Sequence, residues 1–155
     1  MAEKILIVDD DATMANLLST VLEFEGFQPL KALSGEEAIR MVKEESPDLV
    51  LLDIMMPKMD GFEVLARLRG DPRTEKLPVI MLTACTEDRD MFEGWRRGAD
   101  EYVTKPFDPH RLVEIIREVL SRSYEERLEE RARHVEYLLD LLSRIDREKE
   151  KGVRS

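Results

Sequence analysis

Short, almost wholly apolar runs alternate along the chain with longer segments in which apolar residues recur every three or four positions. The first pattern is typical of a strand buried on both faces of a parallel sheet, and the second of an amphipathic helix. Five such strand–helix pairs in succession predict a parallel sheet with helices on both faces. The expected strands are residues 5–8, 27–32, 49–52, 78–82 and 101–103, and the expected helices begin at residues 12, 34, 60, 87 and 109.

The expected fold class is therefore α/β, with a doubly wound, five-stranded parallel sheet. Right-handed crossovers leave few topologies, and the common five-stranded solution is the flavodoxin-like order 2-1-3-4-5. Ligands of such sheets bind beyond the carboxyl ends of the strands, where the chain order reverses. Here that point lies between the first and the third strand.

Charge and composition narrow the function further. The chain has 155 residues and a net charge of −10, and residues 121–155 are charge-balanced, so the whole acidic excess lies in residues 1–120. The acidic charge of residues 1–120 argues against intrinsic nucleic-acid binding and against a surface that binds anionic membranes. The single cysteine, Cys85, the absence of a long apolar stretch and the absence of a signal-peptide pattern favour a cytoplasmic protein.

Acidic residues follow two strands that the topology places side by side. Asp9 and Asp10 end the first strand, and Asp53 ends the third. Carboxylates that meet in one crevice repel one another unless a cation lies between them. Mg²⁺ prefers oxygen ligands of this kind, so the cluster predicts a small magnesium site.

Two polar residues at the ends of neighbouring strands add side chains to this site that can bind a phosphoryl group. Thr83 follows the fourth strand, and Lys105 follows the fifth. An ammonium and a cation neutralise the oxygens of a phosphoryl group in transfer, and a hydroxyl donates a hydrogen bond to it. Asp53 is then the candidate nucleophile, forming an acyl phosphate. Any one of these residues alone would be read as a loop cap, but all of them together favour phosphoryl chemistry.

The motifs resemble those of the receiver domains of two-component response regulators, in the same order and spacing, over about residues 3–120. We therefore divide the chain into a receiver domain, residues 1–120, and a C-terminal helical extension, residues 121–155. The segments that carry the resemblance are residues 5–10, 48–57, 59–61, 82–84, 98–100 and 105–107.

The resemblance implies a role for each residue of the metal site. Asp53 would be the phosphoacceptor and a magnesium ligand, and Asp10 would contact Mg²⁺ directly. Asp9 would act mainly through water, and Met55 would offer its backbone carbonyl. Asp11 matches no ligand of the family and is expected to favour the N-terminus of the first helix.

The resemblance also implies a switch and a phosphoryl donor. Thr83 and Lys105 would hold the phosphoryl oxygens, Tyr102 would turn inward as Thr83 moves, and the Lys105–Pro106 bond would be cis. The donor would be a histidine kinase or a histidine phosphotransfer protein. The chain would not be an enzyme acting on a separate substrate, beyond its own phosphorylation and dephosphorylation. Because Met55 and Cys85 cannot position water well, we expect autodephosphorylation to be slow.

The C-terminal extension carries a heptad pattern without any Gly or Pro before Gly152, so the fifth helix is expected to run on without a break. This seam predicts a coiled coil, either in a parallel homodimer, the first choice, or folded back on the same chain. The end, residues 147–155, is expected to fray. The seam consists of Tyr124, Leu128, Val135, Leu138, Leu142 and Ile145, interrupted by Arg131.

Three other readings stay open at this point. The chain could be part of a larger regulator whose C-terminal helix leads to an output domain, or a dimerisation module whose phosphosite is unused. It could also be a magnesium-dependent aspartyl-phosphate phosphatase of the haloacid dehalogenase type, although such enzymes carry the nucleophile after the first strand. Trp95 is either a partner anchor or a packing residue, and His110 and His134 are expected on the solvated surface.

Overall fold

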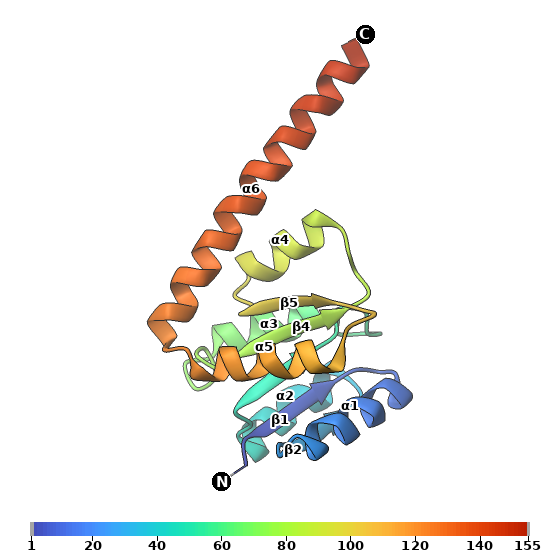
Figure 1. Ribbon diagram of the computed structural model, residues 1–155, viewed down its shortest axis with the longest axis vertical. Coiled ribbons are helices and arrows are strands. Elements are labelled where there is room, and N and C mark those ends of the chain that lie inside the picture. The colour runs from blue at the N-terminus through green and yellow to red at the C-terminus, as the bar shows by residue number, and fades with distance from the viewer. Residues whose placement is uncertain (1, 155) are drawn as a thin grey trace.

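A computed structural model describes residues 2–154 as a five-stranded parallel sheet with helices on both faces and one long C-terminal helix (Figure 1). The strand order is β2-β1-β3-β4-β5, which confirms the predicted topology. The elements are β1 (Lys4–Val8), α1 (Ala12–Phe24), β2 (Gln28–Ala32), α2 (Gly35–Glu45), β3 (Leu49–Leu52), α3 (Gly61–Gly70), β4 (Val79–Thr83), α4 (Asp88–Arg96), β5 (Glu101–Thr104), α5 (Pro109–Ser121) and α6 (Tyr124–Arg154).

The core forms two layers because alternate residues of each central strand point to opposite faces of the sheet. One layer contains Leu6 and Val8 of β1 and packs against α2, α3 and α4. The other contains Ile5 and Ile7 and packs against α1 and α5. Strands β1 and β3 are paired in register, with Val8 opposite Leu52. The residues that follow these two strands therefore leave the sheet side by side.

Capping residues in the sequence fix where the first helices begin. Asp11 is the N-cap of α1, and its side chain accepts hydrogen bonds from the backbone N–H groups of Thr13 and Met14. This confirms the expected role of Asp11. Ser34 caps α2 in the same way and accepts from the backbone N–H of Glu37 at 3.1 Å.

The expectation of one unbroken C-terminal helix is wrong, because α5 ends at Ser121 and α6 begins at Tyr124. Arg122 is extended, with φ −82° and ψ 143°. The Ser123 hydroxyl accepts from the backbone N–H of Glu126, and the Glu126 carboxylate accepts from the backbone N–H of Ser123. This reciprocal pair is a capping box, so a local signal starts a new helix where no Gly or Pro ends the old one.

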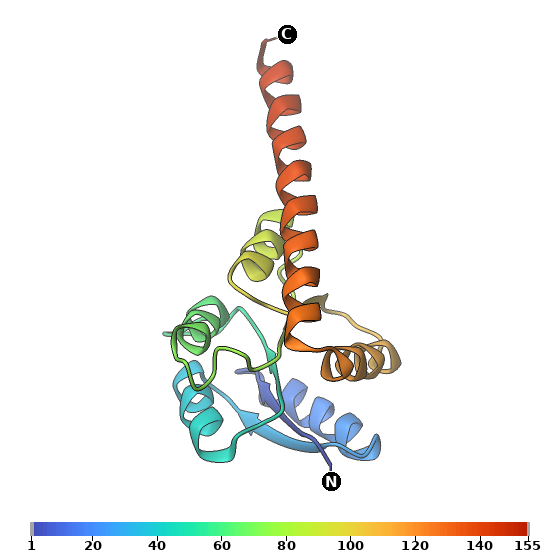
Figure 2. The ribbon, with the colours of Figure 1, turned by 90° about the vertical axis from the view of Figure 1, so that its left-hand side faces the viewer.

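Helix α6 lies against α4 of the same chain and extends beyond it, away from the sheet (Figure 2). Leu138 joins the core layer that contains α4, and the His134 ring stacks on the Trp95 indole, with ring centroids 3.9 Å apart. Folding back, the second of the two partners expected for the seam, is thus what the structure shows. Trp95 is a packing residue, and His134 is not the purely solvated residue expected. The helix continues to Arg154, and the expected fraying of residues 147–155 stays a prediction, with Ser155 outside the described residues.

Within the described part of the chain, no helix is both long enough and apolar enough to cross a lipid bilayer.

Candidate functional site

Three carboxylates converge at the carboxyl ends of β1 and β3. Asp9, Asp10 and Asp53 each offer an oxygen, and these oxygens all lie within 4.8 Å of one another. Asp9 and Asp53 are buried, whereas Asp10 is exposed. The structure thus brings together the acidic residues that the sequence predicted to meet.

Lys105 joins this cluster from the loop after β5. Its Nζ donates to Asp9 Oδ2 at 2.7 Å and to Asp53 Oδ2 at 3.1 Å. Burial by itself would lower the pKa of Lys105, but the hydrogen bonds and the negative charges of Asp9 and Asp53 together outweigh burial and raise that pKa. Lys105 is therefore charged at neutral pH. The Lys105–Pro106 peptide bond is cis, as the resemblance implied.

The set of donors fits a magnesium ion. Three carboxylates carry three negative charges, and Lys105 supplies one positive charge. The uncompensated charge favours a divalent cation, and oxygen atoms of this kind are the ligands that Mg²⁺ prefers.

Gly61 allows the start of α3 to approach Asp53 closely. A Cβ atom at this position would lie 2.2 Å from the backbone oxygen of Asp53. The Gly61 N–H donates to the carbonyl of Ile54 at 2.9 Å, which ties the loop after Asp53 to the helix. In the sequence, Gly61 stands out only as part of a motif. Its packing role was missed because it depends on how closely α3 approaches β3.

Of the remaining predicted residues, Thr83 ends β4, Tyr102 lies within β5 and Met55 lies in the loop after β3. Thr83 is fully buried, and its hydroxyl accepts from the backbone N–H of Cys85 at 3.3 Å. Tyr102 is turned inward, and its hydroxyl donates to the Cys85 carbonyl at 2.7 Å. Burial raises the pKa of Tyr102 above its ordinary value, so the phenol keeps the proton that it donates. Met55 is 65% exposed, and its backbone N–H donates to Asp53 Oδ1 at 3.3 Å.

The Tyr102–Cys85 hydrogen bond should contribute measurably to stability. We expect Tyr102→Phe to lower the free energy of unfolding by about 1 kcal/mol, since it removes the donor to a part-buried carbonyl. Urea denaturation would measure this change. Tyr137→Phe, at an exposed position on α6, is the matched control and should change it little. Equal effects of the two substitutions would contradict a role for the hydrogen bond.

Residues 5–117 match the family described as the response regulator receiver domain. The transcriptional regulator RpaA of Synechocystis is 42% identical over 135 residues, which are 87% of this chain and 55% of that protein. The phosphate regulon regulator PhoB of Escherichia coli is 42% identical over 122 residues, which are 79% of this chain and 53% of that protein. The chain thus spans about half the length of these curated relatives.

Solved structures show the same fold. A CheY-like receiver domain protein from Methanospirillum hungatei has a TM-score of 0.73 and 32% identity, covering 84% of this chain and 99% of that chain. The chemotaxis protein CheY4 of Vibrio cholerae has a TM-score of 0.73 and 30% identity, covering 77% of this chain and 99% of that chain. With its acidic cluster and lysine at the ends of the parallel strands, this chain belongs to the response regulator receiver domain family.

Proposed function

We propose that Asp53 accepts a phosphoryl group from a phosphohistidine of a kinase or phosphotransfer protein. A carboxylate oxygen of Asp53 attacks phosphorus, the P–N bond breaks, and the imidazole leaves. The product is an acyl phosphate on Asp53. The observation that carries the proposal is the contact of Asp53 with Lys105 at 3.1 Å within a cluster of two further carboxylates.

Lys105 and the acidic residues would stabilise this transfer electrostatically. The Lys105 ammonium would neutralise charge on the phosphoryl oxygens, and the buried Thr83 hydroxyl would donate to one of them. Asp10 and Asp53 would bind Mg²⁺ directly, Asp9 would bind it through water, and the Met55 carbonyl would complete the protein ligands. When bound, the ion would supply further positive charge to the phosphoryl oxygens.

Thr83 would transmit phosphorylation to the surface through Tyr102. Both residues are hydrogen-bonded to Cys85, Thr83 to its N–H and Tyr102 to its carbonyl. A movement of the Thr83 hydroxyl toward the phosphoryl group would disturb this shared contact. The Tyr102 ring would then change its packing against α4, where a Cβ on Gly94 would lie 2.9 Å from the ring.

Acetyl phosphate with Mg²⁺ tests this function. We expect the wild-type chain to gain one phosphoryl group, detected by intact mass, and Asp53→Ala to gain none. A phosphatase would instead release phosphate from added phosphate esters with many turnovers. A wild-type chain that takes up no phosphoryl group, or an Asp53→Ala variant that still takes one up, would refute the proposal.

The proposal extends to the cellular location of the chain and to its partners. We propose a cytoplasmic receiver domain in residues 1–120, followed by an extension in residues 121–155 that pairs two copies. RpaA is named as a DNA-binding regulator, but the match covers 55% of that protein. We propose that the acidic receiver itself binds neither nucleic acid nor membranes.

A second candidate, a receiver whose C-terminal helix leads to an output domain, is favoured by the greater length of the relatives.

The lifetime of the phosphorylated state should be long compared with that of receivers carrying polar residues beside the attacking water. The side chains of Met55 and Cys85, two residues after Asp53 and Thr83, cannot orient that water well. We expect Met55→Asn to shorten the phosphoryl half-life, measured by loss of label from the isolated protein. A half-life of seconds for the wild-type chain would contradict this prediction.

A further inference from the structure

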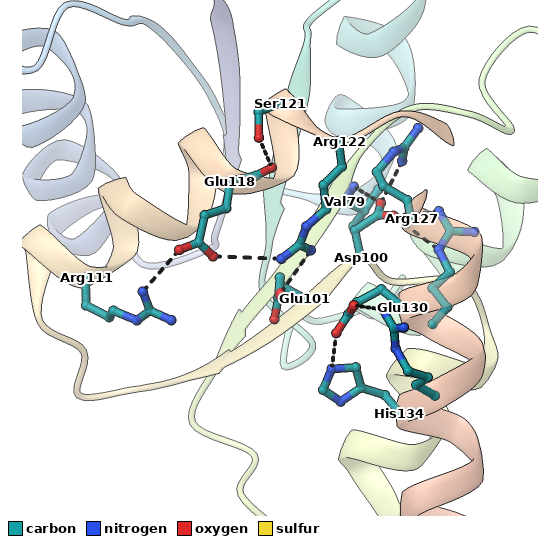
Figure 3. A network of polar contacts seen from close by, with 12 residues as sticks. Val79, Asp100, Glu101, Arg111, Glu118, Ser121, Arg122, Arg127, Glu130 and His134 are labelled. Atoms are coloured by element: carbon teal, nitrogen blue, oxygen red, sulfur yellow. Dashed lines mark hydrogen bonds and ion pairs between the residues drawn. The ribbon is translucent and has the colours of Figure 1, made fainter. Parts of the chain in front are cut away.

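Besides packing on α4, helix α6 is attached to residues 1–120 through the buried carboxylate of Asp100 (Figure 3). Arg131 donates to Asp100 Oδ1 from Nε at 3.1 Å and from Nη2 at 2.8 Å. Arg127 donates to Asp100 Oδ2 at 3.0 Å. Both arginines are buried, and they lie one helical turn apart on the face of α6 that points to residues 1–120. Arg131, the residue that interrupts the seam, is therefore a docking residue.

This attachment can be released without leaving Asp100 unpaired. Asp100 Oδ2 also accepts from the backbone N–H of Val79 at 2.9 Å and from Arg69 at 3.2 Å, and neither donor belongs to α6. The attraction within buried ion pairs is largely offset by the loss of hydration of the charges. When α6 leaves, Arg127 and Arg131 regain water, and water reaches Asp100 Oδ1. The ion pairs with Asp100 thus make a small net contribution to docking, which also depends on the packing of Leu138 and the stacking of His134 on Trp95.

Docking on α4 covers the apolar seam of α6 incompletely. Among the apolar side chains of the seam, Leu138 is buried, whereas Val135, Leu142 and Ile145 are only half-buried. Leu128, which belongs to the seam, is 42% exposed. Leu139, which follows the seam residue Leu138, is 53% exposed. A second apolar helix would cover more of this surface than α4 does, and burial of apolar surface favours association.

One heptad of the seam, which contains Val135 and Leu138, has the residue types of a two-stranded coiled coil. In the heptad register, Val135 and Leu142 occupy a positions, and Leu138 and Ile145 occupy d positions. Val135 at a with Leu138 at d is the combination that favours two strands, whereas Leu142 at a with Ile145 at d is the combination that favours higher oligomers. Arg131 occupies the preceding d position, which is apolar in a stable seam.

The connection between α5 and α6 can straighten. Only Arg122 and Ser123 separate the two helices, and residues 110–151 contain no Gly or Pro. If these two residues became helical, α5 and α6 would form one helix over residues 109–154, and the seam would project from the receiver.

We propose that α6 alternates between two mutually exclusive partners, α4 of its own receiver and α6 of a second copy. Leu138 cannot contact both at once, so pairing of two chains requires release from Asp100 and exposure of Trp95. A two-fold axis would relate the paired helices. This inference deepens the homodimer proposed above, and it is independent of phosphoryl chemistry at Asp53.

The substitution Arg131→Leu in the full chain tests the proposal, because it removes the ion pair with Asp100 and supplies an apolar d residue. We expect the wild-type chain to sediment as a mixture of monomer and dimer, with Trp95 open to acrylamide only in the dimer. Arg131→Leu should sediment as a dimer with Trp95 open to the quencher. Trp95 is the single tryptophan of the chain and lies under His134, so its fluorescence reports docking directly. Arg133→Leu, at an exposed position on the same helix, is the matched control and should behave like the wild-type chain.

A proline at the connection separates a straightened helix from any other dimer. Arg122 already has the extended conformation that a residue before proline favours, so the break between α5 and α6 tolerates Ser123→Pro, although this substitution removes the capping box of α6. It cannot fit inside a continuous helix. Adding Ser123→Pro to Arg131→Leu should therefore restore the monomer. A monomeric Arg131→Leu chain, a dimer of any of these chains in which Trp95 stays protected, or a dimer that survives Ser123→Pro would overturn the proposal.

Discussion

Replacing Asp100 by Asn should lower the free energy of unfolding by about 3–5 kcal/mol, the usual cost of removing one partner from a buried ion pair. The Asp100 side chain has no exposed surface and faces the buried or nearly buried guanidinium groups of Arg69, Arg127 and Arg131. Burial, followed by repulsion from Arg131, already lowers the pKa of Arg69 to about 10, and Asp100 partly offsets both effects. An amide would leave three crowded cations without their counterion.

Chemical denaturation followed by far-ultraviolet circular dichroism would measure the effect of Asp100→Asn. Glu93→Gln is the matched control, because Glu93 pairs with Arg96 and Arg97 at the surface. Surface pairs contribute at most about 1 kcal/mol, so this control should change stability far less. If the two variants unfold at the same denaturant concentration, Asp100 does not hold the arginines in the way that the structure indicates.

The sheet and the acidic cluster could be predicted from the sequence because each depends on a local pattern and one topological rule. Apolar runs such as Ile5–Val8 mark strands buried on both faces, and few orders of five such strands are possible. Once β1 and β3 are neighbours, Asp9 and Asp53 must leave the sheet at the same edge. No side-chain detail was needed to bring them together.

The course of the C-terminal helix could be predicted only in part. The apolar seam was recognised, but its partner depends on which surface it meets in three dimensions. The break before Tyr124 did have a local signal, since Ser123 and Glu126 have the same capping-box spacing as Ser34 and Glu37. The absence of Gly and Pro favours one continuous helix, and the capping box at Ser123 and Glu126 overrides it.

Arg131 shows why a sequence pattern can indicate a position without indicating its purpose. In a heptad seam, an arginine interrupts the apolar pattern. Against Asp100, which belongs to a segment 31 residues earlier, the same arginine is a specific contact. The meaning of a polar residue in an apolar stripe is decided by the charge that it faces, and a periodic pattern carries no information about that charge.

Replacing Lys105 by Met should slow phosphorylation by acetyl phosphate by about 100- to 1000-fold, the usual effect of removing one preorganised charge or donor from a developing anion. Lys105 lies between Asp9 and Asp53, so its ammonium is already positioned where phosphoryl oxygens would approach Asp53. Little reorganisation would then be needed during transfer. The initial rate of phosphorylation at saturating Mg²⁺ would measure the change.

The same substitution should leave Mg²⁺ binding intact or strengthen it, because Lys105 and the metal compete for the same carboxylates. A slower reaction with retained Mg²⁺ affinity would place the effect in the transfer step and separate it from loss of the metal site. Lys31→Met, at an exposed lysine of β2 that is hydrogen-bonded to Asn16, is the matched control and should react at the wild-type rate. If Lys105→Met also reacted at that rate, the ammonium would serve only to balance the buried carboxylates. The phosphoryl-binding role of Lys105 would then be wrong.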